Sequence, residues 1–162
     1  MTRSFTEGRE AENNFIVEAE KHDWTLVRKA SMWEDVYSHW DYLFDTPEGR
    51  KFVDIKAHKH VYRNGPLLKD WFWIEWVNVR GNDGWIRGKS DYIAFNYFDE
   101  WYIYNTNILR TACELLVDFD KKASRATDAD YAIYTRKDKE DQTSLVMISD
   151  LPKPHLLWTK PE

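Results

Sequence analysis

The strongest constraint on the fold is a pair of apolar runs on either side of a turn at residues 46–49, TPEG. The first run, residues 39–44, reads HWDYLF, and the second, residues 51–61, reads KFVDIKAHKHV. Side chains alternate between the two faces of a strand, so Val53 and Ile55 share one face of the second run. Because proline and glycine favour chain reversal, the segment predicts a β-hairpin with its Val53 face toward the core.

Helical periodicity appears in two other segments. Residues 6–22 have apolar side chains at Ala11, Phe15 and Ala19, which is the spacing of one helix face. Residues 105–122 show a similar apolar stripe with a polar opposite face, and we expect this second helix to pack on a sheet.

The remaining apolar runs predict further strands. Residues 71–79 and 85–95 are separated by RGNDG, whose Asn and Gly residues suit a tight reversal, so they predict a second hairpin. Additional strands are predicted at residues 24–30, 101–104, 131–135 and 144–148, the last two as a final hairpin. The predicted fold class is therefore α/β, a central mixed β-sheet flanked by helices, with additional β-hairpins.

The length of 162 residues predicts a single domain spanning residues 1–162. The chain is rich in aromatic residues, yet no apolar stretch is long enough for a membrane span, so no membrane partner is expected. Met1 to Glu10 lacks the apolar region of a secretory signal. The single cysteine, Cys113, fits a reducing compartment, and we expect a cytoplasmic protein.

An acidic side chain interrupts the apolar stripe of the first predicted helix. Glu12 lies three and seven residues before Phe15 and Ala19, which places it on the same face. A carboxylate on an apolar face is costly without a partner. Glu12 is therefore a candidate functional residue.

The predicted hairpin contains three more candidates. Asp54 and Lys56 lie on the face opposite Val53, so one side chain can hold a metal while the other reaches the same phosphate or water. Antiparallel pairing of the two runs brings Asp41 to the same side as Asp54. Two buried carboxylates repel each other unless a cation lies between them, and Mg²⁺ prefers hard oxygen ligands. The pattern predicts a Mg²⁺ or Mn²⁺ site.

In order and context these residues resemble the PD-(D/E)XK, or restriction-endonuclease-like, nuclease superfamily. The motifs are Glu12 in GREAENNF, Asp41 in HWDYLF, and Asp54 with Lys56 in FVDIKAHK. They cover the chain up to about residue 60, and the later segments are similar to small nucleases of this type encoded by phages. The sequence departs from the family pattern in having Trp40 in place of proline and Asp54 where Glu is common.

The resemblance implies a restriction-endonuclease-like fold and metal-dependent hydrolysis of phosphodiester bonds in DNA, with a homodimer as one candidate assembly. Asp41 and Asp54 would bind Mg²⁺ or Mn²⁺ with the backbone carbonyl of Ile55, and Glu12 would complete or support the site. Lys56 would orient or activate the attacking water and stabilise the pentavalent phosphate. These roles agree with the general chemistry of metal-assisted hydrolysis.

Other interpretations remain open from the sequence. One is a non-catalytic module that binds nucleic acid or protein on a nuclease-like scaffold, and another is a structure-selective or RNA-directed nuclease. His58 and His60 alternate on the Asp54 face and also suit a transition metal. Because the net charge is −5, any nucleic acid must be bound through a local basic surface. Candidate residues for that surface are Arg28, Lys29, Lys51, Lys59, Lys69, Arg80, Arg87 and Lys89.

Overall fold

The computed structural model describes residues 3–160, with side chains from residue 6, and divides into two compact units. The first unit contains the chain as far as His58, then Lys89–Thr106, and then the chain from Pro154. The second contains Lys59–Gly88 and Asn107–Lys153. The predicted α/β class is confirmed, because helices accompany a mixed sheet.

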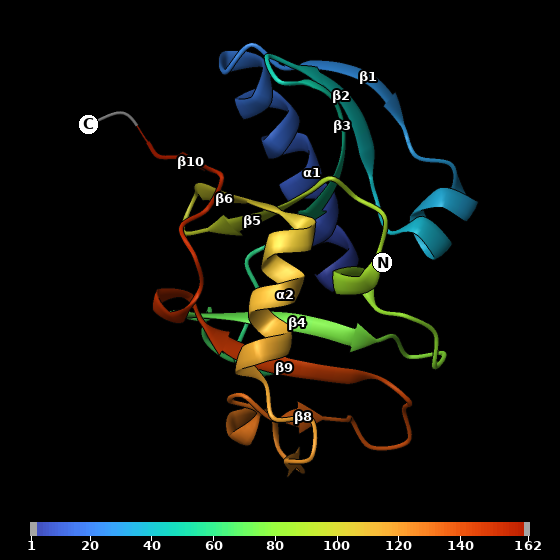
Figure 1. Cartoon of the computed structure of the whole chain (residues 1–162), viewed down its shortest axis with the longest axis vertical. Helices are drawn as coiled ribbons and strands as arrows, with labels where there is room; N and C mark the ends of the chain where they lie inside the picture. The colour runs from blue at the N-terminus through green and yellow to red at the C-terminus, as the bar shows by residue number, and fades with distance from the viewer. Residues whose placement is uncertain (1–2, 161–162) are drawn as a thin grey trace. The chain divides into compact units, whose positions relative to one another are not determined.

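The described part of the first unit combines one long helix with a six-stranded sheet in the order β1-β2-β3-β5-β6-β10. Strands β3 and β5 are parallel, whereas the other neighbouring pairs are antiparallel. Figure 1 shows α1 running alongside β1, β2 and β3. The elements are α1 (Arg3–Lys21), β1 (Thr25–Lys29), β2 (Tyr42–Thr46), β3 (Gly49–Lys56), β5 (Tyr92–Tyr97), β6 (Glu100–Asn105) and β10 (Leu156–Trp158).

The core of the first unit forms where the apolar stripe of α1 meets the sheet. Ala11, Phe15 and Ala19 are buried, as their spacing predicts. The Phe15 ring is fully buried and packs against the rings of neighbouring aromatic residues. These are Trp24, Phe44, Trp101 and Trp158, with centroids 4.9 to 5.8 Å from that of Phe15.

In the second unit, the described strands form a four-stranded sheet in the order β4-β9-β8-β7. Its strands are β4 (Trp71–Val77), β7 (Lys122–Ala123), β8 (Ile133–Tyr134) and β9 (Gln142–Met147). The helix α2 (Thr106–Leu116) also belongs to this unit, except for its first residue. Short 3₁₀ turns occupy Trp85–Arg87, Ala126–Asp128 and Ile148–Asp150. Trp76 is fully buried in this unit and donates its indole N–H to the Ser144 hydroxyl at 3.0 Å.

Several predicted elements are confirmed with shifted ends. The hairpin of the first two apolar runs is β2 and β3, with Tyr42 opposite Val53, although β3 ends at Lys56 and not at residue 61. The first helix, the strands near residues 24–30 and 101–104, and the final hairpin are also present. The spacing of apolar residues within each of these segments was sufficient to predict it.

The predicted second hairpin is wrong. Strand β4 pairs with β9, and β5 pairs with β3 and β6, so residues 71–79 and 85–95 are not partners. The chain does reverse after β4, since Asn78 N–H donates to Asn82 O at 2.8 Å. A 3₁₀ turn at Trp85–Arg87 then occupies the start of the predicted second strand, so these residues do not continue the pairing with β4. The turn residues specify a reversal, but they do not specify the strand that follows it.

The second helix is shorter than predicted. α2 ends at Leu116, six residues before the predicted end at residue 122. From Asn107 onward it belongs to the second unit, and not to the unit that contains the six-stranded sheet. Among residues 3–160, no helix has both the length and the apolar character that crossing a membrane requires.

Phe15→Ala tests the aromatic core. We expect the substitution to lower the free energy of unfolding by about 3–5 kcal/mol, because it removes a fully buried ring and leaves a cavity. Urea denaturation followed by circular dichroism measures this change. The matched control is Val17→Ala on the exposed side of the same helix, with an expected effect within about 0.5 kcal/mol. Equal effects of the two substitutions would contradict the assigned core.

Candidate active site

Asp41 and Asp54 meet at the end of the β2–β3 hairpin. Asp41 directly precedes β2, and its backbone N–H donates to Val53 O at 2.9 Å. The backbone N–H of Ile55 donates to Asp41 Oδ2 at 2.7 Å, which ties this carboxyl group to β3. The charge of Asp54 also acts on Asp41, so the two carboxyl groups belong to one electrostatic environment.

Burial makes this carboxyl pair costly to ionise. Asp54 is only 3% exposed, and burial raises its pKa above the ordinary value, while the Lys56 ammonium opposes the shift. Burial also raises the pKa of Asp41, and the charge of Asp54 raises it further. A second positive charge would therefore stabilise the doubly ionised pair.

Lys56 follows Asp54 on the same face of β3. Its Nζ lies 3.2 Å from Asp54 Oδ2, with about a fifth of the side chain exposed. The contact is an ion pair and not an aligned hydrogen bond, because Asp54 Oδ2 is buried without a hydrogen-bond partner among residues 3–160. The Asp-x-Lys spacing thus places the two charged groups together, and it leaves one carboxyl oxygen able to accept another ligand.

Glu12 belongs to the same electrostatic environment but is not a member of the carboxyl pair. Its half-buried side chain extends from α1, and burial followed by the charge of Asp41 raises its pKa to about 7. The charges of Lys29 and Lys56 oppose this shift. In the described residues, no three His, Cys, Asp or Glu side chains form a ready metal-ligand group.

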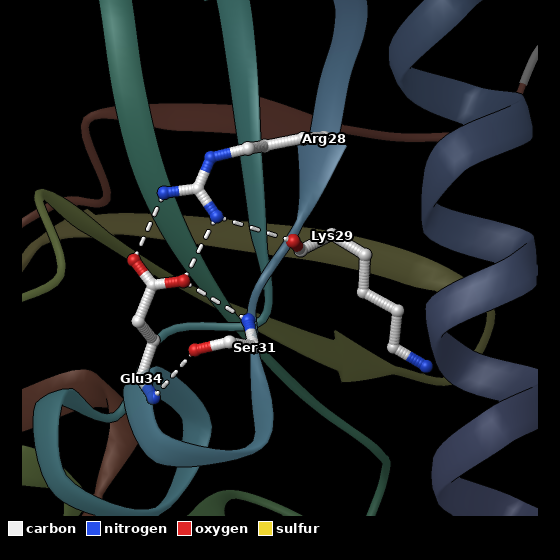
Figure 2. A network of polar contacts seen from close by, with 4 residues as sticks. All are labelled: Arg28, Lys29, Ser31 and Glu34. Atoms are coloured by element: carbon white, nitrogen blue, oxygen red, sulfur yellow. Dashed lines mark hydrogen bonds and ion pairs between the residues drawn. The ribbon is translucent and has the colours of Figure 1, made fainter.

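Sequence patterns did not single out Lys29 and Tyr42 as members of this environment. The two residues are opposite each other in the β1–β2 ladder, and Figure 2 shows the Lys29 ammonium pointing toward α1. The pKa of Tyr42 is raised by burial and then by the charges of Glu12 and Asp41. Because strand register determines these positions, only the strand pairing identifies them. The other basic candidates are distributed over both units.

His58 and His60 do not extend the face of Asp54, so that prediction is wrong. Both follow the end of β3 at Lys56, where strand alternation no longer applies. Phe98 N–H donates to His58 Nδ1 at 3.1 Å, and His60 Nδ1 donates to the carbonyl oxygen of Gly65 at 2.8 Å. The two residues belong to different units. Each ring therefore has a backbone partner.

The donor chemistry of the carboxyl pair fits a hard divalent cation. Asp41 and Asp54 supply carboxylate oxygens, the ligand type that Mg²⁺ and Mn²⁺ use. One of these oxygens, Asp54 Oδ2, is buried without a hydrogen-bond partner in the described chain. Comparisons with protein-family models, curated proteins and solved structures found no match to the chain.

Glu12→Gln tests the environment of the helical carboxyl group through pH. A raised folded-state pKa means that ionisation costs stability as the pH rises from about 4.5 to about 7. The neutral variant should therefore gain stability relative to the wild type across this window. Solvent screening of the half-buried group limits the gain to about 1 kcal/mol at pH 8.

Calorimetric unfolding in EDTA at pH 4.5 and pH 8 measures this gain. Glu20→Gln, at an exposed position of the same helix, provides the control and should show no such pH-dependent difference. A Glu12→Gln effect that is identical at both pH values would show that Glu12 ionises as it does in solvent.

Proposed function

We propose that the protein is a metal-dependent endonuclease that hydrolyses phosphodiester bonds in DNA. The observation that carries this proposal is the Asp41–Asp54 carboxyl pair, in which Asp54 is buried and lies 3.2 Å from the Lys56 ammonium. Such a group can bind a cation, and the ammonium can contact the phosphate that the cation attracts. The helix α1, the hairpin and the mixed sheet support a restriction-endonuclease-like arrangement.

Asp41 and Asp54 would hold Mg²⁺ or Mn²⁺, with the backbone carbonyl of Ile55 as a further oxygen ligand. The hydrogen bond from Ile55 N–H fixes the orientation of the Asp41 carboxyl group, so the residue supports the site through its backbone. When bound, the metal would lower the pKa of a water molecule and offset the charge on the phosphoryl oxygens.

Lys56 would orient the attacking water and stabilise the negative charge that develops on the phosphate. Its ammonium is held at Asp54 and is partly exposed, so it can contact a substrate in solvent. Electrostatic stabilisation of this kind commonly contributes several kcal/mol to catalysis. Glu12 has a pKa of about 7 and can accept or donate a proton near neutral pH. In this proposal it supports the carboxyl pair from α1.

A non-catalytic binding module is the second candidate. The observation that favours it is the low exposure of Asp54, since burial raises the pKa of this carboxyl group and favours its neutral form. In such a module the protonated pair would be structural. Metal binding distinguishes the two functions, because a structural pair has no need of a cation.

Substitutions on β3 test the nuclease proposal. Asp54→Asn and Lys56→Gln should each reduce Mg²⁺-dependent cleavage by roughly a hundredfold or more, because each removes a charge that the reaction uses. Gel assays with plasmid, branched and single-stranded DNA, and with RNA, measure cleavage and identify the substrate. EDTA should abolish it.

Calorimetry with Mn²⁺ separates the roles of the two residues. Asp54→Asn should lose metal binding, whereas Lys56→Gln should retain it while losing cleavage. The control is Asp45→Asn on the same hairpin, where an exposed carboxylate pairs with Arg50 at 2.8 Å, and its activity should be unchanged. Full cleavage by either β3 variant would exclude the mechanism, and a folded protein that binds no Mn²⁺ would favour the binding module.

A further inference from the structure

Residues 31–38, called the aromatic turn below, expose two large rings to solvent. Trp33 is 63% exposed and Tyr37 is 57% exposed, and their centroids are 5.5 Å apart with the ring planes tilted by 44°. Met32 beside them is 84% exposed. Neighbouring exposed apolar side chains commonly mark an interaction surface.

Both ends of the aromatic turn adjoin Asp41. Before the turn, Ala30 N–H donates to the backbone carbonyl of Asp41 at 2.8 Å. After it, Ser38 is buried and its carbonyl accepts the N–H of Lys89 at 2.8 Å, and the chain then returns to Asp41 within three residues. The two ends of the aromatic turn, which carries the exposed rings, therefore lie beside the proposed phosphodiester site.

A network of polar contacts braces the turn (Figure 2). Arg28 donates two hydrogen bonds to the Glu34 carboxylate, at 2.8 and 2.9 Å. Ser31 N–H donates to Glu34 Oε1 at 3.0 Å, and Glu34 N–H donates to Ser31 Oγ at 3.2 Å. These contacts lower the pKa of Glu34 to about 2, so the ion pair persists at neutral pH.

The bracing has two consequences for binding. A turn that is already ordered loses less conformational entropy when it binds a partner. In addition, Arg28 neutralises Glu34, which reduces the repulsion of a polyanion by the turn. Lys29, which precedes the turn on β1, adds a positive charge near α1.

We propose that Trp33 and Tyr37 stack on unpaired bases of single-stranded DNA whose phosphate lies at the carboxyl pair. This inference rests on the proposed function and specifies its substrate class. Base faces are covered by neighbouring bases in a duplex, but they are available to aromatic rings in an unpaired strand. Stacking also supplies affinity that does not depend on net charge, which suits a chain with a charge of −5.

Binding without catalysis tests this inference. The probes are a fluorescein-labelled single-stranded oligothymidine and a blunt duplex of the same length, and fluorescence anisotropy is measured with Ca²⁺ in place of Mg²⁺, so that a divalent cation is available to the carboxyl pair. The wild type should bind the single strand at least tenfold more tightly than the duplex. Trp33→Leu and Tyr37→Leu should each weaken single-strand binding roughly tenfold, because leucine retains apolar bulk but cannot stack.

Phe98→Leu is the matched control, since Phe98 is an aromatic residue in the first unit with an exposed fraction of 47%. Its affinity for the oligothymidine should equal that of the wild type. Unchanged affinity in both turn variants would overturn the inference, as would equal wild-type affinity for the duplex and the single strand.

The outcomes also separate this inference from the proposed nuclease activity. If the rings bind the single strand but no DNA is cleaved with Mg²⁺, the stacking surface is supported and the nuclease proposal fails. If DNA is cleaved but the turn variants bind and cleave it normally, only the stacking surface fails. The absence of single-strand binding by the wild type would overturn the stacking surface.

Discussion

The hydrogen bond from the Ile55 backbone to the Asp41 carboxyl group is the contact on which the proposed site depends. It joins the residue before β2 to β3, and it holds the Asp41 carboxyl group against that of Asp54. The antiparallel register of β2 and β3 makes this contact possible, because Tyr42 lies opposite Val53. A shift of one residue would turn Asp54 to the other face of the sheet. The site is therefore a consequence of hairpin register.

The first unit tolerates the carboxyl pair, in which Asp54 is buried, because the core around it is strongly apolar. β3 lies between β2 and the parallel strand β5, and its Val53 face packs against α1. Asp54 on the same strand is only 3% exposed. The Phe15 ring and its aromatic neighbours stabilise the Val53 face. Local strain and buried charge commonly persist at functional sites when the surrounding structure over-determines them. The burial that makes the pair unfavourable when ionised also strengthens its attraction for a cation.

Separate features of the first unit all adjoin the start of β2. Glu12 on α1 and Lys29 on β1 are electrostatically linked to each other, and Asp41 acts on Glu12 as well. Both ends of the aromatic turn lie close to Asp41, and the Arg28–Glu34 ion pair stabilises the turn. A nuclease that acts on unpaired strands would use these parts together. The carboxyl pair would bind the metal, Lys56 would contact the phosphate, and the rings would hold the bases.

The sequence by itself determined the local elements of this protein and the residues that interrupt them. The alternation around Val53 predicted the hairpin and placed Asp54 beside Lys56, and helical spacing marked Glu12 as an unusual carboxylate, because these patterns involve residues only a few positions apart. Only the tertiary structure decided which strands pair. The reversal after β4 was visible in its Asn and Gly residues, yet β4 pairs with β9 and β5 pairs with β3. Such pairings depend on complementary faces from distant segments, which no local period encodes. For the same reason, the positions of Lys29 and Tyr42 beside the acidic side chains became clear only from the register of β1 and β2.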